Sequence, residues 1–286
     1  MLWSLVIALC VPGWAAAAKA GALAYSVSLG EVDRRSLHAL QGAIDDARRQ
    51  HAAVLILRLD TPGGEEVSMR EMVKAIAAAP LPVIVYVHPR GARADSAGVP
   101  LMLAADVAAM APQTNIGSAT PVRVGPPPRT SSEEQTLRDL RRKALNSGVA
   151  LVRTLAEDHG RNADLAERMV REAENVTALQ ARKQGLIDIV APNERALLRS
   201  LDGYHVKGAK AQRLQTSGLE IRHVADAEIA ALDPGGADPL DETSWWRSFA
   251  LVFGMAGLAV LALWGARRGR SALRRRRRRR AKLRQR

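Results

Sequence analysis

The glycine pair Gly63-Gly64 stands directly after the apolar segment VLILRLD (54–60). Because glycine has no side chain, the backbone amides of such a pair can approach a carbonyl oxygen, as an oxyanion hole requires. A Gly-Gly pair after a strand is more often a plain turn, so these two residues do not identify a site by themselves. They become informative only together with a nucleophile and a base elsewhere in the chain.

A candidate nucleophile is Ser96 in the segment GARADSAG (91–98). The pattern places Ser96 at the start of a helix, directly after a strand and a turn. The first amides of a helix carry partial positive charge, and the amide of Ala97 would face the same way. A serine at this place is also a common helix N-cap, and that alternative stays open.

A candidate general base is Lys143, in a long helix predicted after residue 132. The chain has only seven lysines against thirty-five arginines. Lys143 lies roughly 100° from the centre of the apolar stripe of its helix, where it can face either a cleft or solvent. A free lysine, with a pKa of ~10.4, is charged at neutral pH, so a base here needs burial or nearby arginines to lower its pKa.

Strand and helix patterns alternate along the body of the chain, which predicts an α/β fold with a largely parallel sheet. An edge strand is predicted at 22–29, from its alternating apolar and polar residues. The other predicted strands are buried ones at 54–60, 83–87, 107–111 and 186–190. A helix is predicted from about Asp33 to Arg49, with the apolar stripe Leu37, Leu40, Ile44 and Ala47 on one face. A second helix has the stripe Met69, Met72, Val73 and Ile76, and the long helix has the stripe Leu137, Leu140, Ala144, Gly148, Leu151 and Leu155. Asn162 is a predicted N-cap, and Thr177 with Gln180 a predicted capping box.

Two apolar segments flank this body. Residues 1–20 are predicted to be a signal peptide, cleaved after Ala20, or a retained anchor. Residues 248–265 contain no charge and are long enough for a transmembrane helix. The body is predicted as one domain over 21–230, joined to the helix by a linker at 231–247.

The net charge of +13 belongs to the C-terminal tail. Residues 266–286 hold thirteen of the 42 Lys and Arg residues and no acid, which leaves 29 bases and 29 acids in residues 1–265. The positive-inside rule therefore predicts a cytoplasmic tail and an extracytoplasmic body. No aromatic residues interleave the arginines, so we expect a topology signal near anionic headgroups and no nucleic-acid partner. Cys10 is the only cysteine, so no intramolecular disulfide can form.

The motifs and their order resemble the NfeD family, membrane-bound serine proteases of the Clp class. The resemblance rests on TPGG (61–64), GARxxSAG (91–98), PxTNIGSATP (112–121), a lysine-bearing helix and TAxxAxxxGLID (177–188). It implies a Clp/crotonase-like spiral of ββα units and peptide hydrolysis by a Ser-Lys dyad.

By motif position, the resemblance gives Ser96 as nucleophile and Lys143 as base. It also implies an oxyanion hole formed by the amides of Gly63 or Gly64 and of Ala97. No metal or other cofactor is expected. Implied partners are a stomatin-like membrane protein, as substrate or binding partner, and further copies of the chain in a homodimer or higher homo-oligomer.

Two features of the chain bear on the dyad. Soluble Clp-type proteases have a histidine and Gln-Pro where this sequence has Ala119-Thr120-Pro121, and neither His88 nor His159 fits a Ser-His-Asp triad. Asp95 stands where the family more usually has a small residue. Its carboxylate could pair with Lys143 and keep the lysine charged, or it could pair with Arg93.

Three functions remain in competition. The first is an endopeptidase that cleaves apolar segments of membrane-associated proteins outside the cytoplasm. The second is a non-catalytic Clp-fold scaffold that binds a stomatin-like protein, which Asp95 would favour. Acyl-CoA chemistry on the related crotonase fold fits least, because coenzyme A is cytoplasmic. The chain also has one predicted span after its body, whereas longer family members continue through several spans into a β-barrel domain.

Overall fold

A computed structural model describes residues 23–122 and 127–224 of the chain. The predicted N-terminal segment (1–20), linker (231–247), transmembrane helix (248–265) and basic tail (266–286) lie outside these residues. Within the described ranges, no helix combines the length and the apolar character needed to cross a bilayer.

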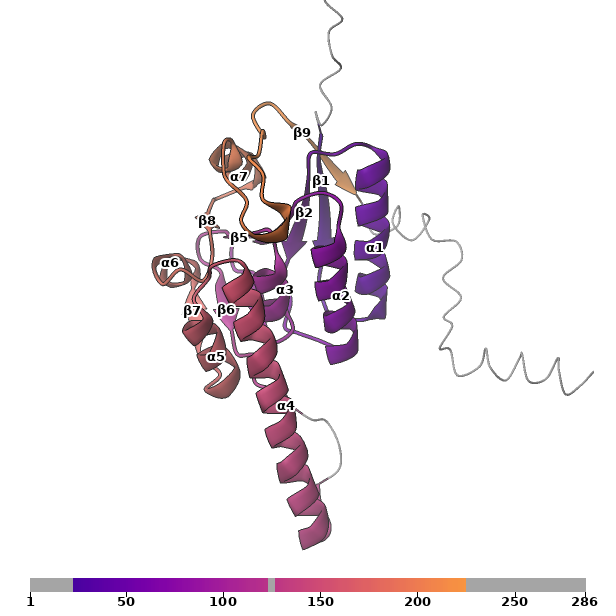
Figure 1. Cartoon of the computed structure of the whole chain (residues 1–286), viewed down its shortest axis with the longest axis vertical. Coiled ribbons are helices and arrows are strands. Elements are labelled where there is room, and N and C mark those ends of the chain that lie inside the picture. Colours follow the sequence, from indigo (N-terminus) through magenta and orange to yellow (C-terminus); the bar gives the residue numbers. More distant parts are fainter. Residues whose placement is uncertain (1–22, 123–126, 225–286) are drawn as a thin grey trace, which may run out of the picture. The chain divides into compact units, whose positions relative to one another are not determined.

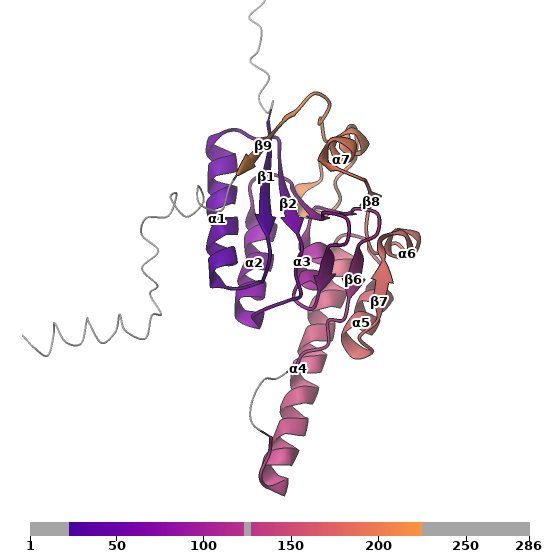
Figure 2. The same cartoon turned by 180° about the vertical axis from the view of Figure 1, so that it is seen from behind.

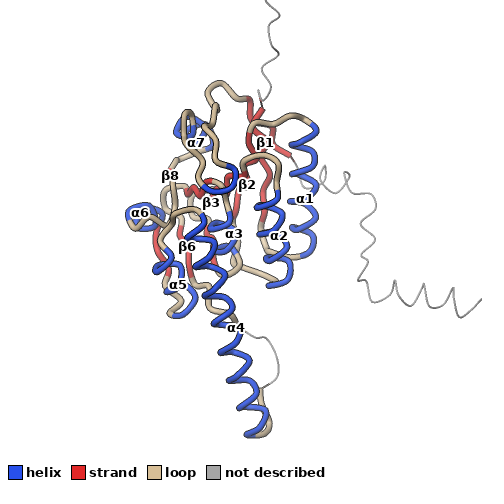
Figure 3. Tube along the Cα trace, viewed as in Figure 1, coloured by secondary structure: helices blue, strands red, loops and turns tan. Residues whose placement is uncertain are grey.

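The main sheet has six strands in the order β8-β5-β3-β2-β1-β9, and every neighbouring pair is parallel. Its strands are drawn in red in Figure 3. They are β1 (Leu23–Leu29), β2 (Val54–Leu59), β3 (Val83–Val87), β5 (Val107–Met110), β8 (Ile189–Val190) and β9 (Glu220–Val224). The prediction of an α/β fold with a largely parallel sheet is therefore confirmed.

Helices connect and cover these strands (Figure 1). They are α1 (Arg34–Arg49), α2 (Glu66–Ala78), α3 (Gly98–Ala104), α4 (Ser131–Asp158), α5 (Ala163–Arg171), α6 (Ala178–Lys183) and α7 (Glu194–Leu201), with a short 3-10 turn η1 (Gly208–Lys210). The predicted stripes of α1 and α2 face the core, since Leu40, Ile44, Met72 and Ile76 are buried. Asn162 caps α5, and Thr177 with Gln180 forms the predicted capping box of α6.

Two hydrophobic cores lie on the two faces of the main sheet. Alternate residues of a strand point to opposite faces, so Leu55 and Leu57 of β2 join one core while Ile56 joins the other. The first core contains the buried sides of α1, α2, α3 and α5. The second core is closed by α7 and by the segment that runs from α7 to β9, seen from behind in Figure 2.

A second sheet of three short strands lies beside the carboxyl ends of the main strands. It has the order β4-β6-β7 and consists of β4 (Arg93–Asp95), β6 (Asn115–Gly117) and β7 (Asn175–Thr177). β4 is parallel to β6, and β6 is antiparallel to β7. The chain enters this sheet immediately before Ser96, so the sheet sets the position of the candidate nucleophile.

The prediction that residues 22–29 form an edge strand is wrong. β1 lies between β2 and β9, because β9 returns from the far end of the domain and pairs along the free side of β1. The polar residue Ser26 is fully buried, and its hydroxyl donates a hydrogen bond to Glu194. The alternating pattern therefore came from a satisfied buried serine and not from a solvent-facing edge.

The predicted apolar stripe of the long helix is only partly correct. The buried residues of α4 are Val149, Val152 and Ala156, all in its C-terminal half. Leu140 is 41% exposed. The N-terminal half of α4 extends beyond the rest of the described domain in both views (Figures 1 and 2).

Candidate active site

Ser96 lies between β4 and α3 in a conformation that is rare for a residue with a side chain. Its φ is 52°, in the left-handed region that costs roughly 1–2 kcal/mol for a non-glycine residue. Its amide donates to the carbonyl of Gly117 at 3.1 Å, and its own carbonyl accepts from Val99 at 3.1 Å. Hydrogen bonds on both sides therefore hold a strained backbone, which is frequent at functional sites.

The alternative that Ser96 caps a helix is not what the structure has. The N-cap of α3 is Ala97, and no side chain makes a capping hydrogen bond to this helix. Ser96 therefore has no capping role that would account for its strained conformation. Its side chain is half-buried and remains reachable from solvent.

Gly63 lies directly against Ser96. A Cβ on Gly63 would be 2.7 Å from the Cβ of Ser96 and 3.0 Å from its Oγ. Only glycine allows this approach, since real Cβ atoms essentially never come so close to a neighbour. The structure thus brings the glycine turn into contact with the candidate nucleophile, although the two are far apart in the sequence.

The two glycines differ in what their amides do. The amide of Gly63 donates to Thr61 Oγ1 at 3.0 Å, and Gly63 is buried. Gly64 is exposed, and a Cβ on it would overlap the carbonyl oxygen of Val32. Among the described backbone hydrogen bonds, neither Gly64 nor Ala97 is a donor. The amides of Gly64 and Ala97 are therefore available to donate hydrogen bonds to a substrate carbonyl beside Ser96.

Thr61 connects the glycine turn to the strand that carries Ser96. Its hydroxyl holds the amide of Gly63, its amide donates to the carbonyl of Arg93, and its carbonyl accepts from Asp95. Thr61 is fully buried. Residue types and spacing alone did not single out Thr61 or Gly117, although both belong to the motifs TPGG and PxTNIGSATP.

Lys143 is exposed on α4, so the burial expected for a base is not found in the single chain. Among the described residues, Lys143 has no hydrogen-bond or ion-pair partner. One turn further along α4, Ser147 accepts a hydrogen bond of 3.0 Å from Arg70 of α2. Residues four apart share a helix face, so Lys143 lies on the same side of α4 as Ser147, whose hydroxyl is bound by Arg70 of α2, the helix following Gly63-Gly64.

The carboxylate of Asp95 pairs with Arg93, one of the two alternatives left open by the sequence. Asp95 Oδ2 is 3.5 Å from Arg93 Nη1. Asp95 Oδ1 accepts hydrogen bonds from the side-chain amides of Asn115 (3.3 Å) and Asn175 (2.9 Å). The described partners of the Asp95 carboxylate therefore all belong to the small sheet.

The described contacts of the two histidines considered for a triad do not include Ser96. His88 stacks on Tyr86, with ring centroids 5.0 Å apart, and burial lowers its pKa. The charges that act on it are those of Glu194 and Arg58, on the far face of the main sheet. His159 ends α4, where its Nδ1 lies 3.1 Å from the carbonyl oxygen of Leu155. Within the described part of the chain, no cluster of three metal-ligating side chains occurs.

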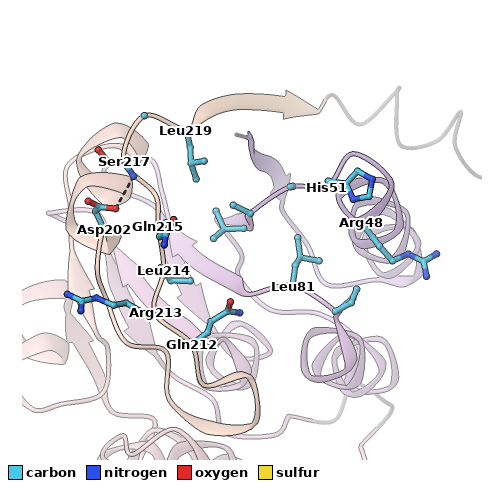
Figure 4. Close-up of a pocket in the computed structure, with 15 residues that line it drawn as sticks. Arg48, His51, Leu81, Asp202, Gln212, Arg213, Leu214, Gln215, Ser217 and Leu219 are labelled. Atoms are coloured by element: carbon cyan, nitrogen blue, oxygen red, sulfur yellow. Dashed lines mark hydrogen bonds between the residues drawn. The ribbon is translucent and has the colours of Figure 1, made fainter. Parts of the chain in front are cut away.

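The described domain has a cavity of about 800 Å³ (Figure 4). It lies at the amino ends of β2 and β3, where Val54 and Leu81 line it. Arg48 and His51 stand on one side and Leu214 and Leu219 on the other (Figure 4). The candidate active site, by contrast, follows the carboxyl end of β2.

The fold and site define a mixed α/β protein whose parallel sheet presents a strained serine beside a glycine turn. Residues 25–224 match the family model of the NfeD1b N-terminal domain, and the chain belongs to this family. Its relatives include the membrane-bound protease PH1510 of Pyrococcus horikoshii, which is 34% identical over 182 residues. The match covers 63% of this chain and 40% of PH1510, so the chain spans less than half the length of that relative.

Solved structures of the protease 1510-N have the same fold. One is described as the membrane-bound stomatin-specific protease with a serine-to-alanine mutation (TM-score 0.64, 29% identity, covering 72% of this chain and 99% of that one). A lysine-to-alanine mutant in complex with a substrate peptide has the same TM-score and identity, with 72% and 93% covered. A third, specific for a stomatin homolog from Pyrococcus horikoshii, has a TM-score of 0.60 and 29% identity over 73% and 98%.

Proposed function

We propose that the chain is a membrane-anchored serine endopeptidase in which Ser96 is the nucleophile and Lys143 the general base. The observation that carries the proposal is the contact between Gly63 and the strained Ser96, beside two amides without an internal acceptor. The relatives support it, since they are named as proteases and were studied as serine and lysine mutants.

In the proposed reaction, Ser96 Oγ attacks the carbonyl carbon of the scissile peptide bond. Neutral Lys143 Nζ accepts the proton of the hydroxyl and then donates it to the leaving amine. The tetrahedral intermediate collapses to an ester on Ser96, and the first product leaves. Water then attacks the ester, with Lys143 as base again, and releases the second product.

Gly64 and Ala97 are the proposed oxyanion donors. The amide of Gly63 already donates to Thr61, so its contribution is the space it leaves beside Ser96. Preorganised amides of this kind are typically worth about 3–4 kcal/mol each in transition-state stabilisation. Of the alternatives Gly63 and Gly64, the hydrogen bonding favours Gly64.

The proposed substrate is an apolar segment of a stomatin-like membrane protein. The 1510-N proteases are described as stomatin-specific, and Val67, three residues after Gly64, is 75% exposed. In the proposed complex, an extended apolar chain bound at the glycine turn covers Val67. Such a chain would also exclude water from Lys143, which is exposed in the described structure.

We also propose a homodimer or higher homo-oligomer, in which a second chain covers part of the exposed surface of α4. The N-terminal half of α4 exposes Leu140 and carries Glu133 and Glu134 before Arg141 and Arg142. A second chain that lies along this half would cover Leu140. A second chain would thereby cover part of the surface around Lys143.

The Clp/crotonase-like spiral and the limits of the domains are also part of the proposal. A Clp/crotonase-like spiral is supported by the small sheet that follows the main one. The domain limits of 21–230, the N-terminal signal or anchor (1–20), the linker (231–247), the transmembrane helix (248–265) and the cytoplasmic tail (266–286) are proposed from the sequence. They place the catalytic domain outside the cytoplasm, attached to the membrane.

The second candidate is a scaffold without catalysis that binds a stomatin-like protein. The exposure of Lys143, without a described partner, is the observation that favours it. A fluorophosphonate probe separates the two functions, because it forms a covalent bond only with an activated serine. We expect labelling of the wild type and none of Ser96→Ala. An unlabelled wild type that still binds a stomatin-like protein would establish the scaffold.

A further inference from the structure

The strained backbone of Ser96 is held on its amide side by the small sheet and on its carbonyl side by Val99 of α3. The amide of Ser96 donates to the carbonyl oxygen of Gly117, the last residue of β6. This hydrogen bond fixes where the peptide plane before Ser96 points. Any displacement of Gly117 would therefore move the nucleophile relative to Gly64 and Ala97.

The backbone at the end of β6 is unusual and packs very closely against the segment that leads into β7. Gly117 has a φ of 151° and packs so closely on β7 that a Cβ would overlap the carbonyl oxygen of Glu174. Ser118, the next residue, also has a left-handed backbone, with a φ of 50°. Its amide donates to Glu174 at 3.0 Å. The acceptor of the Ser96 amide, Gly117, and the next residue, Ser118, thus both have unusual backbone conformations.

The side chain of Asp95 connects all three strands at this point. Its Oδ1 accepts from Asn115 of β6 and from Asn175 of β7. The same Asn175 amide donates to Ser118 Oγ at 3.1 Å, and its carbonyl oxygen accepts from Asn115 at 3.0 Å. Asp95 is also the residue before Ser96, and its side chain is 16% exposed. One acceptor therefore anchors the strand of the nucleophile to the strand that holds its amide.

We propose that Asp95 is a positioning residue for Ser96, acting through Asn115, Asn175 and the carbonyl of Gly117. This inference deepens the proposed function and rests on it. The function of Asp95 is that of a hydrogen-bond acceptor between strands, and Lys143 is not its partner. An acid at this position therefore supports catalysis, and does not weaken it by keeping Lys143 charged.

A comparison of Asp95→Ala with Asp95→Asn distinguishes the role of Asp95 as a hydrogen-bond acceptor from the effect of its negative charge. Asparagine keeps an oxygen that can accept from both amides, whereas alanine removes it. We expect Asp95→Ala to lower kcat roughly 10- to 100-fold while KM changes little, because a misplaced nucleophile affects the reacting step. Asp95→Asn should recover most of that loss, and Asn175→Ala should resemble Asp95→Ala. Asp45→Ala, an exposed acid paired with Arg48 on α1, is the matched control and should stay active.

Amide hydrogen exchange provides a readout that does not depend on catalysis. In Asp95→Ala, exchange at the Ser96 amide should accelerate while the strands of the main sheet stay protected. If Asp95→Ala kept wild-type kcat and exchange, or if Asp95→Asn were as damaged as Asp95→Ala, the positioning role would be wrong. A wild type with no fluorophosphonate labelling would refute the proposed function instead, and the exchange data would still decide whether Asp95 holds Ser96.

Discussion

Gly63 and Ser96 are in van der Waals contact in such a way that no side chain fits between them. A Cβ on Gly63 would lie 2.7 Å from the Cβ of Ser96. Both residues have left-handed φ values, 124° for Gly63 and 52° for Ser96. The candidate nucleophile therefore stands against the turn that carries the candidate oxyanion amide, and the packing of these two residues determines the space left for a substrate.

Gly63→Ala should abolish activity, because the new methyl group must displace Ser96. Gly91→Ala is the matched control, since Gly91 also has a positive φ (87°) but a methyl group there would meet no atom within 4 Å. Backbone strain should cost both variants roughly 1–2 kcal/mol of stability, and the clash with Ser96 should add to this loss in Gly63→Ala. Peptidase assays and thermal unfolding should then show a loss of activity for Gly63→Ala alone. Equal activity of the two variants would contradict the assigned contact.

Ser96→Gly should be inactive and yet more stable than Ser96→Ala. Glycine adopts a φ of 52° without the cost that alanine bears, which is roughly 1–2 kcal/mol for a non-glycine residue. The greater flexibility of unfolded glycine offsets part of this gain. Denaturant unfolding of the two variants measures the difference. A Ser96→Gly protein clearly less stable than Ser96→Ala would show that Ser96 is not strained in solution.

Lys143→Ala should be about as damaging as Ser96→Ala, because the members of a catalytic unit act non-additively. Lys143→Arg should fail as well, since a guanidinium stays protonated and cannot serve as a base. Lys183→Ala, at the exposed end of α6, is the control and should retain wild-type kcat. Substantial activity in the arginine variant would leave Lys143 an electrostatic role only.

The pH dependence of stability should carry a contribution from His159. Burial, followed by the charge of Arg161, lowers the pKa of His159 in the folded protein below its usual value of 6.5. The unfolded chain therefore takes up this proton first, and the contribution to stability, full above about pH 6.5, is lost as the pH falls below it. Thermal unfolding at pH 7.5 and pH 5 should show a smaller decrease for His159→Gln than for the wild type. An identical decrease in stability for the two proteins would mean that a group other than His159 causes the loss.

The proposed topology predicts the pattern of digestion in intact spheroplasts. Added protease should digest residues 21–244 and spare the arginine-rich tail, because thirteen cations do not readily cross a bilayer. Replacing Arg274 to Arg280 with neutral residues should weaken this orientation without altering the catalytic domain. A tag after Arg286 that reacted from outside would reverse the assignment and place the domain in the cytoplasm.

Local patterns in the sequence determined most of the secondary structure and the candidate residues. The apolar segments of β2, β3 and β5, the stripes of α1 and α2, and the caps at Asn162 and Thr177 are all as predicted. These features depend on residues a few positions apart, so periodicity and capping chemistry suffice to find them. The motifs likewise selected Ser96, Lys143 and the glycine pair before their arrangement was known.

Only the tertiary structure decided how these residues meet. In that structure, β9 pairs with β1 and makes it an internal strand, and Lys143 is exposed. The amide of Gly63 donates to Thr61, and the carboxylate of Asp95 accepts from two distant side chains. The partners of Asp95 are 20 and 80 residues away, at Asn115 and Asn175. Which acceptor lies within about 3 Å of a given donor depends on how distant segments pack, and no local pattern in the chain specifies that distance.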